Sequence, residues 1–321
     1  MGFIKVKMKK KAIIISIKSY ALSSNEKILL SKEKPWGLIL FKRNIKSVNQ
    51  LKNLIIKIRK LTKDSKFPII IDEEGETVSR LHRIIKNDVS QKLFGDMFIH
   101  QPKLSIKIYK NYINQLCKIL RELGINVNTV PVLDVLRKNT NKIIGNRSFS
   151  TNPYIVKKLG QICIDQYKKN KIGTVIKHIP GHGCSKIDSH IKLPKIKLSL
   201  NKLKKIDFIP FKFSKSIFAM TAHILYEKID KFNVATFSKK IINKIIKKEM
   251  GFKGVIISDD ISMKALKFDL ITNAKNSLSA GCNLVLYCAG NYRELQSLIK
   301  EMPYIDNFTI KKTSEFYKFL R

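Results

Sequence analysis

The tripeptide Asp188-Ser189-His190 places a carboxylate two residues before an imidazole. A carboxylate at that spacing can accept a hydrogen bond from the imidazole and fix which ring nitrogen carries the proton, as in an oriented general acid and base. The alternative is a surface aspartate and histidine that share a mobile loop. Two further histidines, His178 and His182, lie four residues apart upstream. Because Pro180 and the neighbouring glycines exclude a continuous helix there, this pair does not form a helical zinc site.

Asp259 stands two residues after the apolar run 254–257. A carboxylate held at the end of a rigid buried strand suits a nucleophile or a metal ligand. Its neighbour Asp260 is expected to point elsewhere. Other charged residues lie at the ends of other apolar runs or in nearby loops: Asp72, Arg80, Arg147 and Lys177. Such groups offer donors and acceptors for sugar hydroxyls, and the alternative for each is a structural ion pair.

Eight short apolar runs have the composition of strands buried on both faces, and longer amphipathic stretches separate them. The runs are 12–17, 36–41, 67–71, 125–130, 173–176, 218–221, 254–257 and 283–287. Helices are predicted at 47–61, 105–123, 153–170, 238–250, 272–280 and 291–300, with a terminal segment at 304–321. This alternation predicts an α/β fold, a (β/α)8 TIM barrel, with residues 1–321 in a single domain. The competing architecture is an open doubly wound sheet, and the absence of a GxGxxG motif after the first strand weighs against a dinucleotide site in it.

In a barrel of this type, active-site residues follow the carboxyl ends of the strands. Four of the six histidines fall on two predicted strand ends or in the loop after one of them. A random gathering of polar residues in loops would not produce this clustering. The chemically active residues are therefore expected to meet at one end of the barrel.

The net charge of +39 arises from 54 lysines and nine arginines against 24 acidic residues. Lysine is spread over the whole chain, and no basic stripe is interleaved with aromatic residues, so we interpret the charge as a compositional bias and expect no nucleic-acid binding. Attraction to an anionic partner or a membrane surface is the alternative. A hydrophobic content of 44% excludes a disordered chain, and five cysteines exclude a disulfide scaffold.

Membrane insertion is not expected, because no uncharged apolar run approaches the roughly 18 residues of a transmembrane helix. The basic N-terminal segment and the apolar run 12–17 imitate a signal peptide. That run is ended by Lys18 and is shorter than an ordinary signal-peptide core. We therefore expect a cytoplasmic protein with buried, reduced thiols.

Several motifs in a fixed order resemble the bacterial β-N-acetylhexosaminidases of glycoside hydrolase family three. The matching segments span about residues 35 to 290 and are IDEEG (71–75), VSRL (78–81), GINV (124–127), PVLD (131–134), GNRSF (145–149), KHIPGHG (177–183), DSH (188–190), AH (222–223) with Tyr226, and SDD (258–260). The KHIPGHG segment followed by DSH is the most specific of them.

The resemblance implies a retaining mechanism in which Asp259 is the nucleophile and His190, oriented by Asp188, is the acid and base. It also implies that a terminal N-acetylglucosamine is held by a second set of residues, Asp72, Arg80, Arg147, Lys177 and His178. The expected substrate is a cell-wall fragment, N-acetylglucosamine linked to an anhydro-muropeptide, in peptidoglycan recycling. Neither a metal nor an organic cofactor is required, and a monomer is expected.

The chain departs from the family pattern at Glu76 and Thr77, where the family usually has glycine and arginine. Glutamate adopts a positive φ less readily than glycine, so this departure leaves the conformation of the loop open. Three rival functions remain open: a phosphorylase that uses the same glycosyl-enzyme with phosphate as acceptor, a sugar-binding protein without catalysis, and a nucleic-acid-binding protein. A neutral His190, oriented by Asp188, would allow phosphate to approach.

Overall fold

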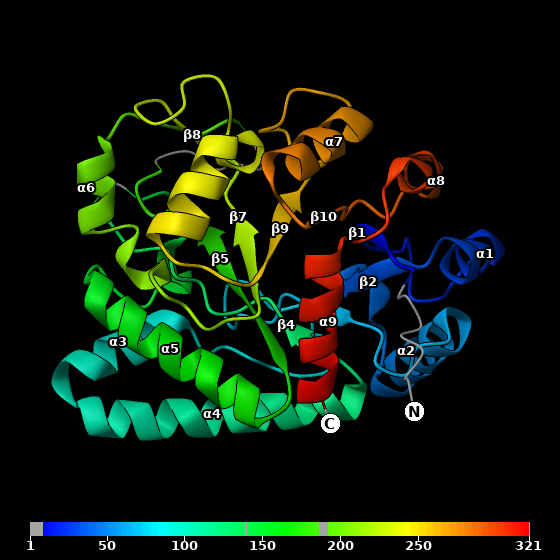
Figure 1. Ribbon diagram of the computed structural model, residues 1–321. Coiled ribbons are helices and arrows are strands. Elements are labelled where there is room, and N and C mark those ends of the chain that lie inside the picture. Colours follow the sequence, from blue (N-terminus) through cyan, green and yellow to red (C-terminus); the bar gives the residue numbers. More distant parts are fainter. Residues whose placement is uncertain (1–8, 139, 186–191, 321) are drawn as a thin grey trace, which may run out of the picture.

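A computed structural model describes residues 9–138, 140–185 and 192–320. Eight parallel strands form a closed barrel and are ordered around it as they are along the chain, which confirms the (β/α)8 prediction and excludes the open doubly wound sheet (Figure 1). The barrel strands are β1 (Lys11–Ile15), β2 (Pro35–Leu40), β3 (Ile69–Ile71), β4 (Val127–Asn128), β5 (Gly173–Ile179), β7 (Phe218–Thr221), β9 (Val255–Asp260) and β10 (Leu284–Leu286). Two short strands, β6 (Lys195–Ile196) and β8 (Leu225–Tyr226), pair with each other outside the barrel.

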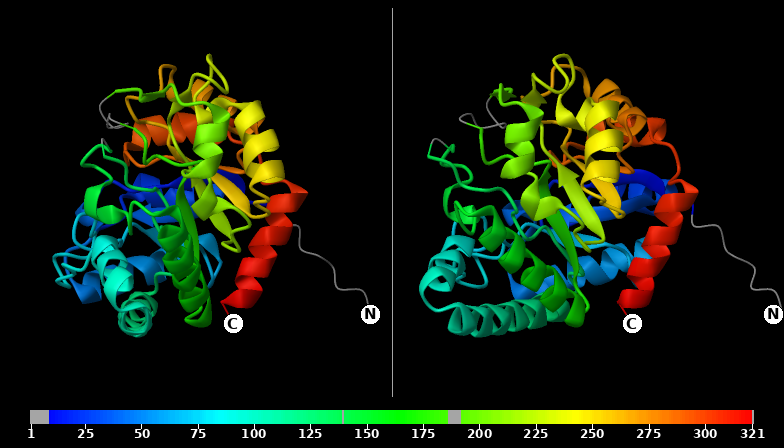
Figure 2. Two further views of the ribbon diagram at one scale, coloured as in Figure 1. Left: turned by 90° about the vertical axis from the view of Figure 1, so that its left-hand side faces the viewer. Right: turned by 60° about the vertical axis from the view of Figure 1, so that its left-hand side comes forward.

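Helices surround the barrel, as the two views of Figure 2 show. They are α1 (Ser24–Glu33), α2 (Val48–Thr62), α3 (Gln91–His100), α4 (Pro102–Leu123), α5 (Pro153–Lys169), α6 (Leu200–Lys205), a π-helix (Lys240–Glu249), α7 (Leu270–Ala280), α8 (Tyr292–Glu301) and α9 (Asn307–Phe319). Each of the six predicted helices overlaps one of these helices, and the predicted terminal segment contains α9. Helices α1, α3 and α6 were not predicted.

The N-terminus of α1 is set by a capping box rather than by an apolar stripe. The Ser23 hydroxyl accepts a hydrogen bond from the backbone N–H of Glu26, and the Glu26 carboxylate accepts one from the backbone N–H of Ser23. The apolar residues of α1 are consecutive, 28–30, so they do not repeat at the spacing of an amphipathic helix. Periodicity therefore could not find this helix, although its cap is present in the sequence.

Side chains alternate between two apolar layers along each strand. In β9, Val255 and Ile257 join a cluster inside the barrel, whereas Ile256 between them joins the larger cluster under the helices. Helix α9 covers the amino-terminal end of the barrel, where Phe316 packs edge-on against Phe218 with ring centroids 5.3 Å apart. The barrel interior is therefore packed with side chains, and in this fold the active site lies at the carboxyl end.

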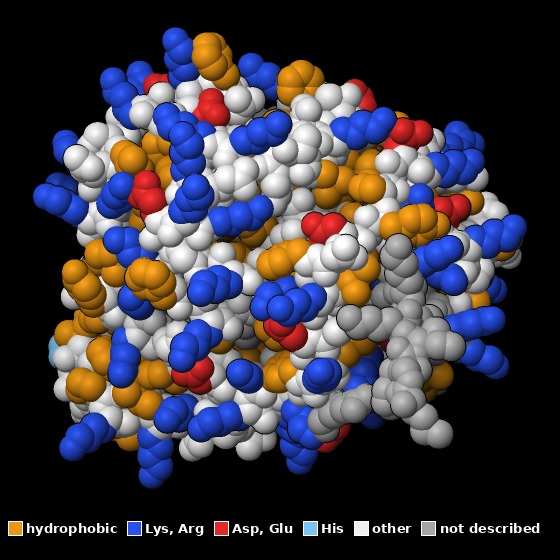
Figure 3. Space-filling model, in the orientation of Figure 1, with side chains coloured by type: hydrophobic (Ala, Val, Ile, Leu, Met, Phe, Trp, Pro, Cys, Tyr) orange, Lys and Arg blue, Asp and Glu red, His pale blue; other side chains and the backbone are white. Residues whose placement is uncertain are grey.

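The surface is rich in cations without a single dominant cluster on the face that Figure 3 shows, where lysine and arginine side chains are scattered between apolar and neutral ones. This agrees with the dispersed pattern in the sequence. Within the described residues, none of the helices combines the length and the apolar composition that crossing a bilayer requires.

Candidate active site

The predicted site residues that the structure describes lie at the carboxyl end of the barrel. Asp72 directly follows β3, Lys177 and His178 belong to the last part of β5, and Asp259 belongs to the last part of β9. The sequence predicted that β5 and β9 end before these residues. Both strands are longer because their ladders continue, with Ile179 opposite Thr221 and Asp260 opposite Leu286.

A network of five charged side chains occupies one side of this end. Arg80 donates to the Asp72 carboxylate at 2.9 Å, and the Lys177 ammonium lies 3.5 Å from the other oxygen of that carboxylate. Lys177 also contacts Glu74 at 2.5 Å. The Arg147 guanidinium donates hydrogen bonds to both carboxylate oxygens of Glu74, at 2.7 and 2.9 Å. The structure therefore brings four of the predicted residues together and adds Glu74 between them.

Burial and charge act in opposite directions on the two carboxylates of this network. Burial alone would raise their pKa values, but the neighbouring cations outweigh it. Lys177 and Arg80 hold the pKa of Asp72 well below its usual range. Arg147 and Lys177 lower the pKa of Glu74 to about 2. Both carboxylates are therefore ionised at neutral pH, and Glu74 is a poor candidate for a general acid.

The side chains of this network differ in how far they are exposed. The side chains of Glu74 and Lys177 are each 3% exposed, and that of Arg147 is 8% exposed. Arg80 is 25% exposed at its side chain and lies over the Phe41 ring, 5.2 Å from its centroid. Asp72 is 13% exposed. Asp72 and Arg80 are thus the most open members of the network.

A second group forms around Asp134, on the loop after β4. The His178 Nδ1 lies 2.7 Å from one oxygen of the Asp134 carboxylate, and the backbone N–H groups of His178 and His182 donate to the other at 3.2 and 2.6 Å. The two imidazole rings are 5.6 Å apart in an edge-on arrangement. Burial, reinforced by His178, lowers the pKa of His182 to about 4, so His182 is neutral at neutral pH.

Asp259 and Asp260 point to different partners, as the sequence predicted. The Asp259 carboxylate accepts a hydrogen bond from the backbone N–H of Asp260 at 2.8 Å. The Asp260 carboxylate instead accepts from the Ser262 hydroxyl and from the Cys288 backbone N–H. Burial raises the pKa of Asp260.

His223 lies beside these two residues and supports their backbone. Its Nε2 donates to the Asp260 carbonyl at 2.9 Å, and its Nδ1 lies 2.8 Å from the Thr236 hydroxyl. Burial lowers the pKa of His223 even though the nearby Asp259 carboxylate acts in the opposite direction. The imidazole therefore holds the backbone carbonyl of Asp260, the residue that follows Asp259.

Asp188 and His190 lie outside the described residues. The loop that leads toward them is anchored at its start: the Tyr226 hydroxyl donates to the Gly181 carbonyl at 2.6 Å, and the Thr140 hydroxyl donates to the Gly183 carbonyl at 2.5 Å. Gly183 itself has no space for a side chain, because a Cβ there would lie 1.8 Å from the Val135 carbonyl oxygen.

The loop after β3 does not show the strain expected from the loss of a glycine at position 76. Among the described residues, the positive-φ residues other than glycine are Lys34, Lys63, Lys171 and Phe213, so Glu76 has an ordinary backbone. The positive φ in this loop, 128°, falls on Gly75. Glu76 accepts a hydrogen bond from the Asn146 side chain at 3.2 Å. Glu76 therefore carries no positive-φ strain, because the positive φ of this turn falls on a glycine.

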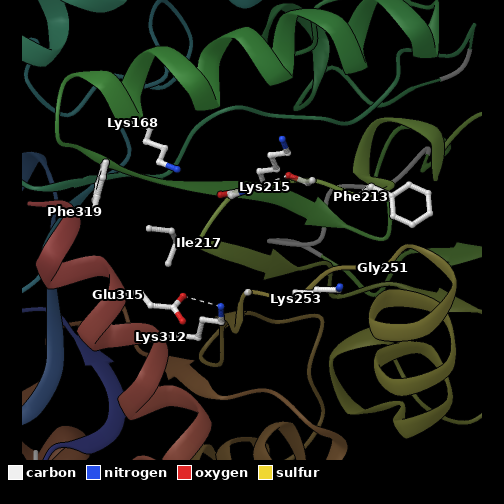
Figure 4. Close-up of a pocket in the computed structure, with 12 residues that line it drawn as sticks. Lys168, Phe213, Lys215, Ile217, Gly251, Lys253, Lys312, Glu315 and Phe319 are labelled. Atoms are coloured by element: carbon white, nitrogen blue, oxygen red, sulfur yellow. Dashed lines mark hydrogen bonds and ion pairs between the residues drawn. The ribbon is translucent and has the colours of Figure 1, made fainter.

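A cavity of about 450 Å³ lies at the opposite, amino-terminal end of the barrel (Figure 4). Its lining includes Lys168, Lys215 and Lys253, and Lys312 in it is paired with Glu315. None of the predicted site residues borders it. Because catalysis in this fold occurs at the carboxyl end, the cavity is not the active site.

Three residues of the site were not among those predicted from the sequence: Glu74, Thr129 and Asp134. Thr129 accepts a hydrogen bond from Lys177 at 2.8 Å and donates to Asp72. Glu74 and Asp134 also lie just after predicted strands, and this position was the feature of the sequence that could have identified them as site residues. Their roles depend on which neighbours they meet, and strand ends alone do not provide that information.

Comparisons with known proteins agree with this geometry. Residues 5–312 match the glycosyl hydrolase family 3 N-terminal domain. The chain belongs to this family. A β-hexosaminidase from Neisseria gonorrhoeae is 32% identical over 304 residues, which cover 93% of this chain and 81% of that protein. A β-hexosaminidase from Nitrosomonas eutropha is 31% identical over 281 residues, covering 86% and 80%.

Solved structures of this family have the same fold. The crystal structure of NagZ from Neisseria gonorrhoeae in complex with N-trifluoroacetyl-D-glucosamine superposes with a TM-score of 0.86 at 28% identity, covering 98% of this chain and 90% of that one. Native NagZ from the same organism gives a TM-score of 0.87 at 29% identity. The family 3 chain described here is therefore a glycoside hydrolase of the β-hexosaminidase type, and the resemblance found in its motifs is confirmed.

Proposed function

We propose that this enzyme removes a terminal β-linked N-acetylglucosamine with retention of configuration. The observation that carries the proposal is the partly open pair of Asp72 and Arg80 beside Lys177, at the same barrel end as Asp259. This arrangement offers fixed donors and acceptors to sugar hydroxyls next to a carboxylate. The glucosamine derivative named for the gonococcal NagZ structure supports the choice of sugar.

The proposed reaction has two steps. In the first, the Asp259 carboxylate attacks the anomeric carbon, and His190 gives its proton to the leaving glycosidic oxygen. In the second, His190 removes a proton from water, which attacks the same carbon and releases Asp259 as a free carboxylate. Asp188 orients the imidazole throughout. A histidine suits both steps because its pKa lies near neutrality.

The remaining predicted residues would bind the sugar. Asp72 would accept hydrogen bonds from hydroxyls, Arg80 and Lys177 would donate to them, and His178 would bond to them through one ring nitrogen. Arg147 uses three of its five N–H groups on Glu74 and on the Ile143 carbonyl. It would reach the sugar through the other two.

The proposed physiological substrate is an N-acetylglucosaminyl anhydro-muropeptide from peptidoglycan recycling, cleaved in the cytoplasm by a monomer. We also propose that residues 1–321 act as one domain, and this is supported by the single barrel and the apolar layers that run around it. No metal or organic cofactor has a step in this reaction.

A direct test is the turnover of a chromogenic aryl β-N-acetylglucosaminide by the purified protein, measured with and without inorganic phosphate. We expect free N-acetylglucosamine in both cases, with β as the first-formed anomer by NMR. The matched aryl β-glucoside, which lacks the acetamido group, should be cleaved far more slowly. Formation of the sugar 1-phosphate when phosphate is added would identify a phosphorylase instead. No cleavage of either substrate would refute the proposed function.

A further inference from the structure

Asp134 is a charged residue at the centre of the site for which the proposed reaction has no step. Asp134 is fully buried, with 0% of its surface exposed. One carboxylate oxygen faces the His178 ring at 2.7 Å, and the other receives the backbone N–H groups of His178 and His182. The Ser148 hydroxyl donates to the Asp134 backbone carbonyl at 2.6 Å, which fixes the loop on which the carboxylate is carried.

The carboxylate is held in its ionised form. Burial would raise the pKa of Asp134, but its interactions with His178 and His182 outweigh burial, and the pKa lies below its ordinary value. An ionised carboxylate can only accept hydrogen bonds. The nitrogen opposite it, His178 Nδ1, must therefore carry a proton.

The contact between Asp134 and His178 Nδ1 determines how the other ring nitrogen, Nε2, can form hydrogen bonds. With the proton on Nδ1, a neutral His178 presents Nε2 as a hydrogen-bond acceptor, and a protonated one presents it as a donor. The ring is also held in place, because the same carboxylate bonds both the ring and the backbone of His178. His178 is 8% exposed, so only a small part of it can meet a ligand.

We propose that Asp134 is a positioning residue that fixes the tautomer and the orientation of His178 for binding the sugar. The inference rests on the proposed function, in which His178 contacts a hydroxyl group of the substrate. Asp134 acts through His178 and does not touch the substrate itself.

The variant Asp134→Asn separates this role from simple support of the loop. The Oδ1 of the new asparagine must accept from the backbone N–H groups of His178 and His182, because an amide NH₂ in that position would place its own hydrogen atoms against those of the two donors. Its Nδ2 then faces His178 Nδ1 and forces that nitrogen to become an acceptor. The substitution is isosteric and keeps the backbone contacts, but it moves the imidazole proton to Nε2.

A matched control is Asp207→Asn. Asp207 has a side chain that is 0% exposed, is paired with Arg137, and packs against Gly181 of the same loop. The described contacts of Asp207 do not include His178. Loss of its charge therefore tests the general effect of neutralising a buried carboxylate near this loop.

The first readout is the ¹⁵N NMR spectrum of histidine-labelled protein, with the His178 signals assigned by their loss in His178→Ala. The chemical shifts of the ring nitrogens report which of them is protonated. We expect a protonated Nδ1 in the wild type and in Asp207→Asn, and an unprotonated Nδ1 in Asp134→Asn. Retention of the Nδ1 proton in Asp134→Asn would overturn the proposal.

The second readout is a double-mutant cycle on the aryl β-N-acetylglucosaminide. Asp134→Asn should reduce kcat/KM by about 10- to 100-fold, mostly through KM, as for loss of a charge-assisted hydrogen bond. In the His178→Ala background the same substitution should have little further effect. A full, additive loss in that background would show that Asp134 acts on the loop and not through His178. If the wild type does not cleave the substrate, the proposed function fails, and the NMR spectrum alone decides the tautomer assignment.

Discussion

Replacing Glu74 with glutamine would leave the Arg147 guanidinium and the Lys177 ammonium facing a neutral amide in a site with almost no solvent. The Glu74 side chain is 3% exposed and accepts hydrogen bonds from both cations. Removal of one member of a buried ion pair destabilises a protein strongly, because the remaining charge stays desolvated without its partner. We expect Glu74→Gln to be folded but less stable than the wild type.

The pKa of Glu74 provides the magnitude. The cations lower it from 4.5 to about 2, and a difference of that size corresponds to about 3 kcal/mol of stability at neutral pH. For a chain of this length, that loss corresponds to a decrease in Tm of about 5 °C. Because the pKa is lower in the folded state, the contribution is fully present above the ordinary pKa and is lost only as the pH falls toward 2.

The assay is thermal unfolding followed by circular dichroism, for the wild type and the variant, at several values between about pH 5 and pH 8. The difference in Tm should be the same across this range. The control is Glu301→Gln, which removes the carboxylate of an exposed pair with Lys275 and should leave Tm unchanged. A Tm for Glu74→Gln equal to that of the control, or a difference that vanishes near neutral pH, would refute the reasoning.

Three further predictions concern catalysis and charge. Asp259→Ala should reduce turnover of the aryl substrate by about 10⁴-fold or more while its circular dichroism spectrum stays that of the wild type, and substantial remaining activity would place the nucleophile elsewhere. His190→Ala should lose most activity on substrates with poor leaving groups and be rescued by azide, with Asp188→Asn giving a milder defect; equal losses on all leaving groups without rescue would contradict the acid and base assignment. Binding to labelled duplex DNA, followed by fluorescence anisotropy, should be weak and decrease steeply with salt, whereas sequence-selective binding at physiological salt would contradict the interpretation of the charge.

The sequence alone predicted the barrel, because the order of strands and helices along the chain can be recognised from short segments one at a time. Each strand is a short apolar run, and each of the six predicted helices overlaps a helix of the structure. It also predicted which end carries the charged residues, since parallel strands in a closed barrel all point one way. The motifs located the charged residues without any knowledge of their neighbours.

Only the tertiary structure decided how those residues pair. Glu74 lies between Arg147 and Lys177, residues that are distant along the chain, and Asp134, on the loop after β4, meets His178 on the neighbouring strand β5. The pKa values follow from these contacts and from burial, and neither is encoded in the spacing of residues along one strand. Gly75, and not position 76, adopts the positive φ of the loop after β3, because the fold of that turn selects which residue must adopt it.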